Sequence, residues 1–125
     1  MTLKSKLTTA VATAAVAMTA FTGAAGASSA DKVSIKGDNG DYYGYVKSSD
    51  PDTCANERTV TVFKQLGATQ DPRSDQKIGS DTTELNGTKY QWSIGNSGYK
   101  TGSFYAKAAK VPGLCKAVTS KTITR

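Results

Sequence analysis

Residues 76–107 read QKIGSDTTELNGTKYQWSIGNSGYKTGSFYAK, and the spacing of their apolar residues decides the fold class. Asn86-Gly87 is the strongest short-range signal for a β-hairpin turn, because both residues tolerate positive φ. After this turn Tyr90, Trp92 and Ile94 alternate with polar residues, which is typical of a strand with one buried face. The stretch therefore predicts a hairpin whose second strand contributes to the core.

The same alternation recurs on both sides of this hairpin. The strand before it is predicted over residues 78–83, with a turn at 84–87, and a glycine-rich turn at 95–102 leads into a strand at 104–107. The remaining predicted strands cover residues 32–36, 42–47, 58–65 and 116–124. About seven short strands without helical periodicity predict an all-β, two-sheet sandwich of immunoglobulin-like or prealbumin-like architecture. A small closed barrel is the alternative, since strand number alone does not separate the two.

The first 27 residues are predicted to be a secretory signal peptide rather than part of the fold. Lys4 and Lys6 form a basic start, residues 7–23 carry no charge, and Ala25-Gly26-Ala27 fits the small-residue cleavage pattern, with residues 28–30 as a second option. A membrane anchor is the alternative, but the uncharged segment is only weakly apolar and ends in small residues. We expect residues 28–125 to form one secreted, extracellular domain that has no membrane span after cleavage.

Cys54 and Cys115 are the two cysteines of the chain, and in an exported protein they predict one disulfide. It would close a loop of about 60 residues, which the chain-entropy model values at about 4 kcal/mol of stability. A pair of free thiols is the alternative, although the spacing matches neither a redox nor a zinc motif. Residues 28–125 hold 14 basic and 10 acidic residues, a net charge of +4. Such a charge suits an anionic cell-wall polymer, or simply keeps the protein soluble.

An aromatic and basic face is the most specific candidate for a binding surface. In two of the predicted strands, tyrosines alternate with core residues and share their side of the strand with a lysine. If the two strands were neighbours, these side chains could stack on sugars and attract anions. The alternative is that the tyrosines are ordinary strand formers. The predicted face consists of Tyr43, Tyr45, Lys47, Tyr105 and Lys107.

Several short motifs follow one another along the chain. They are GYV at 44–46, TVTVFK at 59–64, IGSDTTELNG at 78–87, YQWSI at 90–94 and GSFYAKA at 102–108. Their order resembles that of carboxypeptidase regulatory-like domains, which are transthyretin-like (prealbumin-like) β-sandwiches. The chain departs from that pattern in its longer hairpin and in Phe104, where the family has tyrosine. It is also similar to small secreted single-domain proteins of actinobacterial type. The resemblance implies a seven-stranded sandwich that accompanies enzymes or surface proteins and does not itself catalyse a reaction.

The chain contains no histidine, which excludes a Ser-His-Asp or Cys-His catalytic arrangement and histidine-based metal sites. Its paired carboxylates lie in predicted turns, where aspartate commonly bonds its own backbone. A calcium site at residues 38–41 is the alternative for one pair, but its spacing does not match an EF-hand loop. We therefore predict no enzymatic activity, no cofactor and no metal site. The pairs are Asp38 and Asp41, Asp50 and Asp52, and Asp71 and Asp75.

These observations favour a secreted, non-enzymatic β-sandwich module with a binding or structural role at the cell exterior. One alternative is a cell-envelope or polysaccharide-binding protein that uses the tyrosine and lysine side chains named above. Its partner would be a cell-wall polymer or an extracellular protein, with no nucleic acid expected. Another alternative is a secreted inhibitor or effector that uses the loop 67–75. This loop has no apolar residue after Ala68 and is predicted to be flexible.

Overall fold

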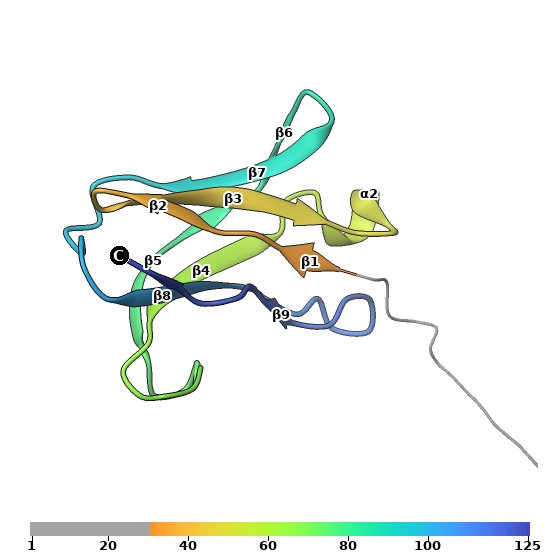
Figure 1. Cartoon of the computed structure of the whole chain (residues 1–125). Helices are drawn as coiled ribbons and strands as arrows, with labels where there is room; N and C mark the ends of the chain where they lie inside the picture. The colour runs from red at the N-terminus through yellow and green to blue at the C-terminus, as the bar shows by residue number, and fades with distance from the viewer. Residues whose placement is uncertain (1–30) are drawn as a thin grey trace, which may run out of the picture.

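The computed structural model describes residues 31–125, which form two antiparallel β-sheets packed face to face (Figure 1). This confirms the predicted all-β sandwich. The predicted signal peptide, residues 1–27, lies outside the described residues. Within residues 31–125 no helix has the length and apolar character needed to cross a membrane.

The first sheet has the strand order β1-β3-β7-β6, and β2 pairs with β3 alongside β1. Every pair in it is antiparallel. Its strands are β1 (Lys32–Val33), β2 (Lys36–Asp38), β3 (Asp41–Lys47), β6 (Glu84–Asn86) and β7 (Lys89–Ile94).

The second sheet has the order β10-β8-β4-β5, and β9 also pairs with β8. A short helix, α2 (Pro51–Cys54), connects β3 to β4. The sequence analysis did not predict this helix, because a single turn of four residues is too short to show helical periodicity. The strands of the second sheet are β4 (Thr59–Lys64), β5 (Gln76–Thr82), β8 (Ser103–Ala108), β9 (Val118–Thr119) and β10 (Ile123–Thr124).

The two sheets bury a common hydrophobic core. Trp92 and Phe104 are fully buried in it, and Tyr90 and Ile94 pack against it from partly buried positions, so all four predicted core residues contribute. The ring of Tyr42, also buried, lies 4.7 Å from that of Phe104, measured between ring centres. Burial of a side chain of this size contributes about 1.5–3 kcal/mol. The indole N–H of Trp92 has no hydrogen-bond partner among the described residues.

A serine interrupts the strand at one edge of each sheet. Ser34 lies between β1 and β2, and Ser120 lies between β9 and β10. The backbone N–H of Tyr45 donates to Ser34 Oγ, and that of Ala106 donates to Ser120 Oγ, both at 2.9 Å. Each serine hydroxyl therefore accepts the hydrogen bond that a backbone carbonyl of the edge strand would otherwise accept. The backbone N–H of the neighbouring strand thus stays paired where the edge strand is interrupted. β1 and β2 can be counted as one interrupted strand, as can β9 and β10, and β5 and β6 as one bent strand. Counted in this way, the ten labelled strands become the predicted seven.

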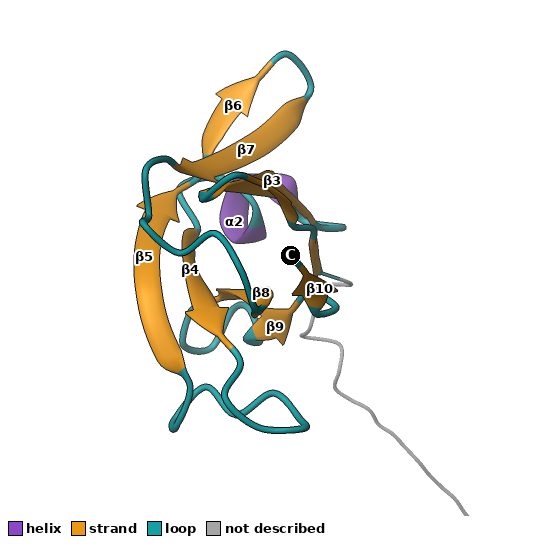
Figure 2. Cartoon of the chain, turned by 60° about the vertical axis from the view of Figure 1, so that its left-hand side comes forward, coloured by secondary structure: helices purple, strands orange, loops and turns teal. Residues whose placement is uncertain are grey.

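The predicted hairpin is only partly correct. β5 pairs with β4 in the second sheet, and between β5 and β6 the chain crosses to the first sheet (Figure 2). Thr83 is the residue between these two strands. The short β6 is therefore the partner of β7, and the two-residue turn is Gly87-Thr88, one residue later than predicted, with Gly87 at φ 66°. The buried Thr83 fixes the crossing, because its Oγ1 donates to the carbonyl of Ala55 and accepts the N–H of Arg58.

Candidate functional site

Exposed tyrosines lie at the centre of the outer face of the first sheet. β3 alternates strictly between core and solvent, so Tyr43, Tyr45 and Lys47 point away from the core. The two tyrosines are 39% and 36% exposed. Their alternation in this strand is as predicted, and they share a sheet face that carries further lysines.

Cross-strand register adds lysines from the neighbouring strands. Lys36 lies directly opposite Tyr43, and Lys32 lies directly opposite Lys47. On the other side of β3, β7 contributes a lysine whose Nζ lies 4.8 Å from the centre of a tyrosine ring, within cation–π distance. We call this set the tyrosine–lysine face. It consists of Lys32, Lys36, Tyr43, Tyr45, Lys47 and Lys89.

This face contains two like charges in direct opposition. Lys32 and Lys47 are cross-strand partners, an arrangement that reduces stability relative to an opposite-charge pair. Within residues 31–125 the ion pair found is between Arg58 and Asp31, so no described carboxylate lies within ion-pair distance of either lysine. The face therefore presents positive charge that an anion from outside could neutralise.

The structure divides the five residues of the predicted binding face. Tyr43, Tyr45 and Lys47 lie together on β3 in the first sheet, whereas Tyr105 and Lys107 lie on β8 in the second. The prediction assumed that the two strands were neighbours, and they are not. The partners of β8 are β4, β9 and β10, because the loop after β7 carries the chain to the other sheet.

Tyr105 is also fully buried, so it is not available for binding. Its ring stacks on Phe63 at 5.3 Å outside the main core, and its hydroxyl donates to Asp75 Oδ2 at 2.6 Å. Burial, and then this hydrogen bond, raise the pKa of Tyr105. In turn the hydrogen bond from Tyr105, followed by those from the backbone N–H groups of Leu66 and Asp71, lowers the pKa of Asp75.

The loop 67–75 is tethered at several points, which argues against the predicted flexibility. Asp75 accepts the hydrogen bonds just described and joins the two ends of the loop. Gln70 donates to the carbonyl of Ser120 and to Thr122 Oγ1, both at 2.9 Å. Thr122 Oγ1 in turn donates to Gln65 Oε1 at 2.7 Å. Polar side chains, which are typical of mobile loops, here hold the loop to the second sheet.

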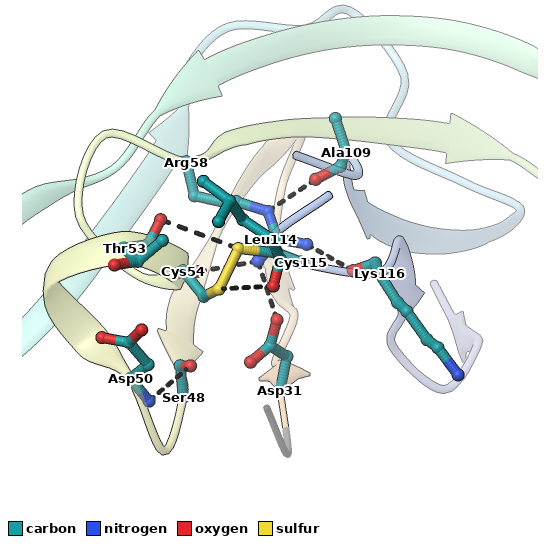
Figure 3. The surroundings of a disulfide bond; sticks show 10 residues. All are labelled: Asp31, Ser48, Asp50, Thr53, Cys54, Arg58, Ala109, Leu114, Cys115 and Lys116. Carbon is teal, nitrogen blue, oxygen red and sulfur yellow. Dashed lines mark hydrogen bonds and ion pairs between the residues drawn. A yellow bond between two sulfur atoms is a disulfide. The ribbon is translucent and has the colours of Figure 1, made fainter. Parts of the chain in front are cut away.

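The predicted disulfide is present between Cys54 and Cys115, whose Cα atoms are 5.8 Å apart and 61 residues apart in sequence (Figure 3). The two sulfur atoms and a carboxylate oxygen of Asp31 lie within 4.8 Å of one another. Because the sulfurs are bonded to each other, this group offers no thiolates for a metal ion. The free-thiol alternative is therefore wrong for this structure.

A buried arginine holds the segments around the disulfide together (Figure 3). Arg58 is 1% exposed, and its Nε donates to the carbonyl of Ala109 at 2.5 Å. Its Nη1 donates to the carbonyl of Cys54 at 2.7 Å and to Asp31 Oδ2 at 3.0 Å, and its Nη2 donates to the carbonyl of Lys116 at 2.6 Å. One guanidinium thus connects the start of β1, both cysteine segments and the end of β8. It has a structural role that the sequence analysis missed.

Three of the paired turn aspartates serve as hydrogen-bond acceptors, two through a side-chain oxygen and one through its backbone carbonyl. Asp41 Oδ1 accepts the backbone N–H of Asn96, and Asp71 Oδ1 accepts that of Arg73. The carbonyl of Asp50 accepts the first hydrogen bonds of α2. The Asp71 contact, two residues along its own turn, agrees with the turn-forming role of aspartate, whereas Asp41 joins the β2–β3 turn to the loop after β7.

Sequence reasoning missed the lysines that β1, β2 and β7 bring to the tyrosine–lysine face. A usable signal was present at Asn39-Gly40, where both residues have positive φ and form a two-residue hairpin turn. Such a turn pairs residues 38 and 41, and the same register leads directly to Lys36 opposite Tyr43.

No protein-family model matches the chain, and no curated protein or solved structure matches it either. The resemblance to transthyretin-like domains therefore stays a prediction, and the interpretation of function depends on the geometry of this molecule.

Proposed function

We propose that this protein is an extracellular, non-enzymatic binding module that contacts anionic cell-envelope polymers through its tyrosine–lysine face. A disulfide in a small domain is typical of proteins that work in oxidising compartments outside the cytoplasm. The face lies on an outer sheet surface, with its tyrosines and lysines open to solvent.

The observation that carries the proposal is the opposed pair of lysines beside two exposed tyrosines. Lys32 and Lys47 repel each other across the sheet, and an anionic group bound between them would relieve that repulsion. The rings of Tyr43 and Tyr45 are two residues apart on one strand, about 7 Å, so they can contact successive units of an extended polymer. Tyrosine supplies an apolar ring face for a sugar together with a hydroxyl for hydrogen bonding.

Co-sedimentation with purified anionic cell-wall polymer tests this proposal. We expect Tyr43→Ala/Tyr45→Ala and Lys32→Gln/Lys47→Gln each to weaken binding about tenfold. The matched control is Lys110→Gln/Lys121→Gln, which removes the same charge at exposed positions outside the face. Raising the ionic strength should weaken binding of the native protein, because screening reduces charge attraction.

Three outcomes would contradict the proposal. They are equal loss of binding in the control variant, binding that does not depend on the tyrosines, and equally tight binding to single-stranded DNA of the same charge. The last would indicate general polyanion affinity rather than recognition of an envelope polymer.

The loop 67–75 supports a second candidate function, that of a secreted inhibitor. An inhibitory loop must hold its shape while presenting side chains to its target, and Asp75 and Gln70 tether this loop to the body of the domain. Next to it Leu66 is 63% exposed. A protease panel tests the idea, and cleavage within residues 66–75 without inhibition of any enzyme would dismiss it.

A further inference from the structure

A groove of about 510 Å³ lies beside the β6–β7 hairpin. One wall is the hairpin, with Leu85 and Tyr90, and the other is formed by Val46 near the end of β3, by Pro51 at the start of α2 and by Ala55 just after it. In Figures 1 and 2 the hairpin projects away from the rest of the sandwich, on the side where α2 lies. The volume falls within the range of pockets that hold small-molecule ligands.

The groove exists because the chain changes sheets at Thr83. Val46, Tyr90 and Leu85 are cross-strand partners in one row and therefore share the inner face of the first sheet. Beneath Val46 the second sheet completes the core, and Val46 is 2% exposed. At the far end of the row Leu85 is 59% exposed. An apolar row thus continues out of the core to a position that no described element covers.

The charge at this groove is entirely positive. Lys47 and Lys89 are among its lining residues, and no aspartate or glutamate is. Neither lysine has a carboxylate within ion-pair distance in residues 31–125. The outward side of the same hairpin carries the exposed polar residues Glu84 and Asn86, so the hairpin as a whole does not have the apolar surface expected for insertion into a membrane.

We propose that the groove binds free amphipathic anions, meaning molecules with a medium-length acyl or alkyl chain and a terminal carboxylate or phosphate. The chain packs along Leu85 and the partly exposed Tyr90, next to the buried Val46, and replaces water on the exposed apolar surface of these two residues. The terminal anion lies at the mouth of the groove, between Lys47 and Lys89. This site does not depend on polymer binding, because its apolar half uses residues outside the tyrosine–lysine face.

Titration with decanoate and decyl phosphate below their micellar concentrations tests the site, with binding followed by backbone amide chemical shifts. Decanol and decyltrimethylammonium have the same chain without the negative charge. We expect both anions to shift the amides of Val46, Leu85 and Tyr90, decanol to bind about tenfold more weakly, and the cation not to bind.

Two substitutions at exposed leucines provide a matched comparison. Leu85→Ser is expected to weaken decanoate binding about tenfold, because it removes most of the apolar contact at the open end. Leu114→Ser should leave binding unchanged, since Leu114 is similarly exposed, at 55%, and does not line the groove. Both variants should keep the melting temperature of the native protein, because exposed substitutions have small effects on stability. Lys89→Gln is expected to weaken binding of the two anions about fivefold and to leave binding of decanol unchanged.

The proposal is overturned if Leu85→Ser and Leu114→Ser have the same effect, or if decanol and the cation bind as tightly as decanoate. It is also overturned if free decanoate does not bind while phosphatidylglycerol vesicles do, since that result would assign the apolar surface to a membrane. Tyr43→Ala affects polymer binding and leaves this groove intact, so failure of one proposal can be distinguished from failure of the other.

Discussion

Arg58 is expected to be the most sensitive single position for the stability of this domain. Replacement by methionine keeps an apolar stem of similar length and removes the guanidinium. The three carbonyl groups of Cys54, Ala109 and Lys116 then lose a donor, and the carboxylate of Asp31 loses its ion pair with Arg58. The Asp31 side chain is 4% exposed, so water can reach it only poorly.

The magnitude follows from these contacts. Removing one partner of a buried ion pair costs about 3–5 kcal/mol, and an unsatisfied buried polar group costs about 1–3 kcal/mol. Because the hydrogen bonds to the carbonyl groups of Ala109 and Lys116 are only partly buried, water can replace the donor there, and we expect a net loss of about 4 kcal/mol for Arg58→Met. A domain of this size has a total stability of about 5–15 kcal/mol, so the variant would lie close to the unfolding threshold.

Urea unfolding followed by the fluorescence of Trp92 measures this loss. With a typical m-value of about 2 kcal/mol/M, the midpoint for Arg58→Met should fall by about 2 M. Arg58→Lys keeps the charge, but a single ammonium group cannot reach all four acceptors, so an intermediate loss is expected. Arg58→Met combined with Asp31→Asn should cost less than the sum of the two single changes, with a coupling of about 1–3 kcal/mol. A loss below about 1 kcal/mol for Arg58→Met, or strict additivity with Asp31→Asn, would refute this reasoning.

Further predictions concern the disulfide, the buried tyrosines and one glycine. The mature protein should have a mass two hydrogens below that of the reduced form, and replacing both cysteines with alanine should lower the free energy of unfolding by about 4 kcal/mol. Burial raises the pKa of Tyr42 and of Tyr105. They therefore add stability that is complete below about pH 10 and is lost as pH rises above it, so part of the phenolate absorbance should appear together with unfolding. Gly44→Ala should cost about 1–3 kcal/mol in thermal or urea unfolding, because the added Cβ would lie 2.0 Å from the carbonyl oxygen of Ser34.

Each of these predictions has its own control or contradicting result. A measured mass equal to that of the reduced chain would show that the disulfide is not formed. Phenolate absorbance that is complete before alkaline unfolding begins would show that both buried tyrosines are accessible. Gly67→Ala is the control for Gly44→Ala, since no atom lies within 4 Å of its added Cβ. Equal effects of the two glycine substitutions would contradict the close approach of Ser34 to Gly44 of β3.

Much of the fold could be predicted because local alternation and turn residues agree with it. Trp92 lies in an alternating run and is buried, as is Phe104, and the disulfide between the two cysteines agrees with the prediction made from their even number. Asn39-Gly40 could have fixed the register of β2 against β3 as well.

The remaining features depend on relations between strands that are distant in sequence. Alternation places Tyr105 on the side opposite the core, but it does not reveal that loop 67–75 covers that side. Sequence pattern also does not show that the chain changes sheets at Thr83, because a buried threonine there resembles any polar strand residue. Arg58 has the charge of a surface residue, and its burial follows only from the backbone carbonyls that converge on it. For the same reason the groove beside Leu85 could not be predicted.

An amide chemical-shift titration of the protein with a soluble anionic cell-wall polymer tests binding at the tyrosine–lysine face most directly. We expect the shifts to concentrate on the tyrosine–lysine face, in β1, β2, β3 and the start of β7, and to diminish as salt is added. Shifts concentrated in β4, β8 or the loop 67–75, or no shifts at polymer concentrations that saturate known polyanion binders, would contradict binding at this face.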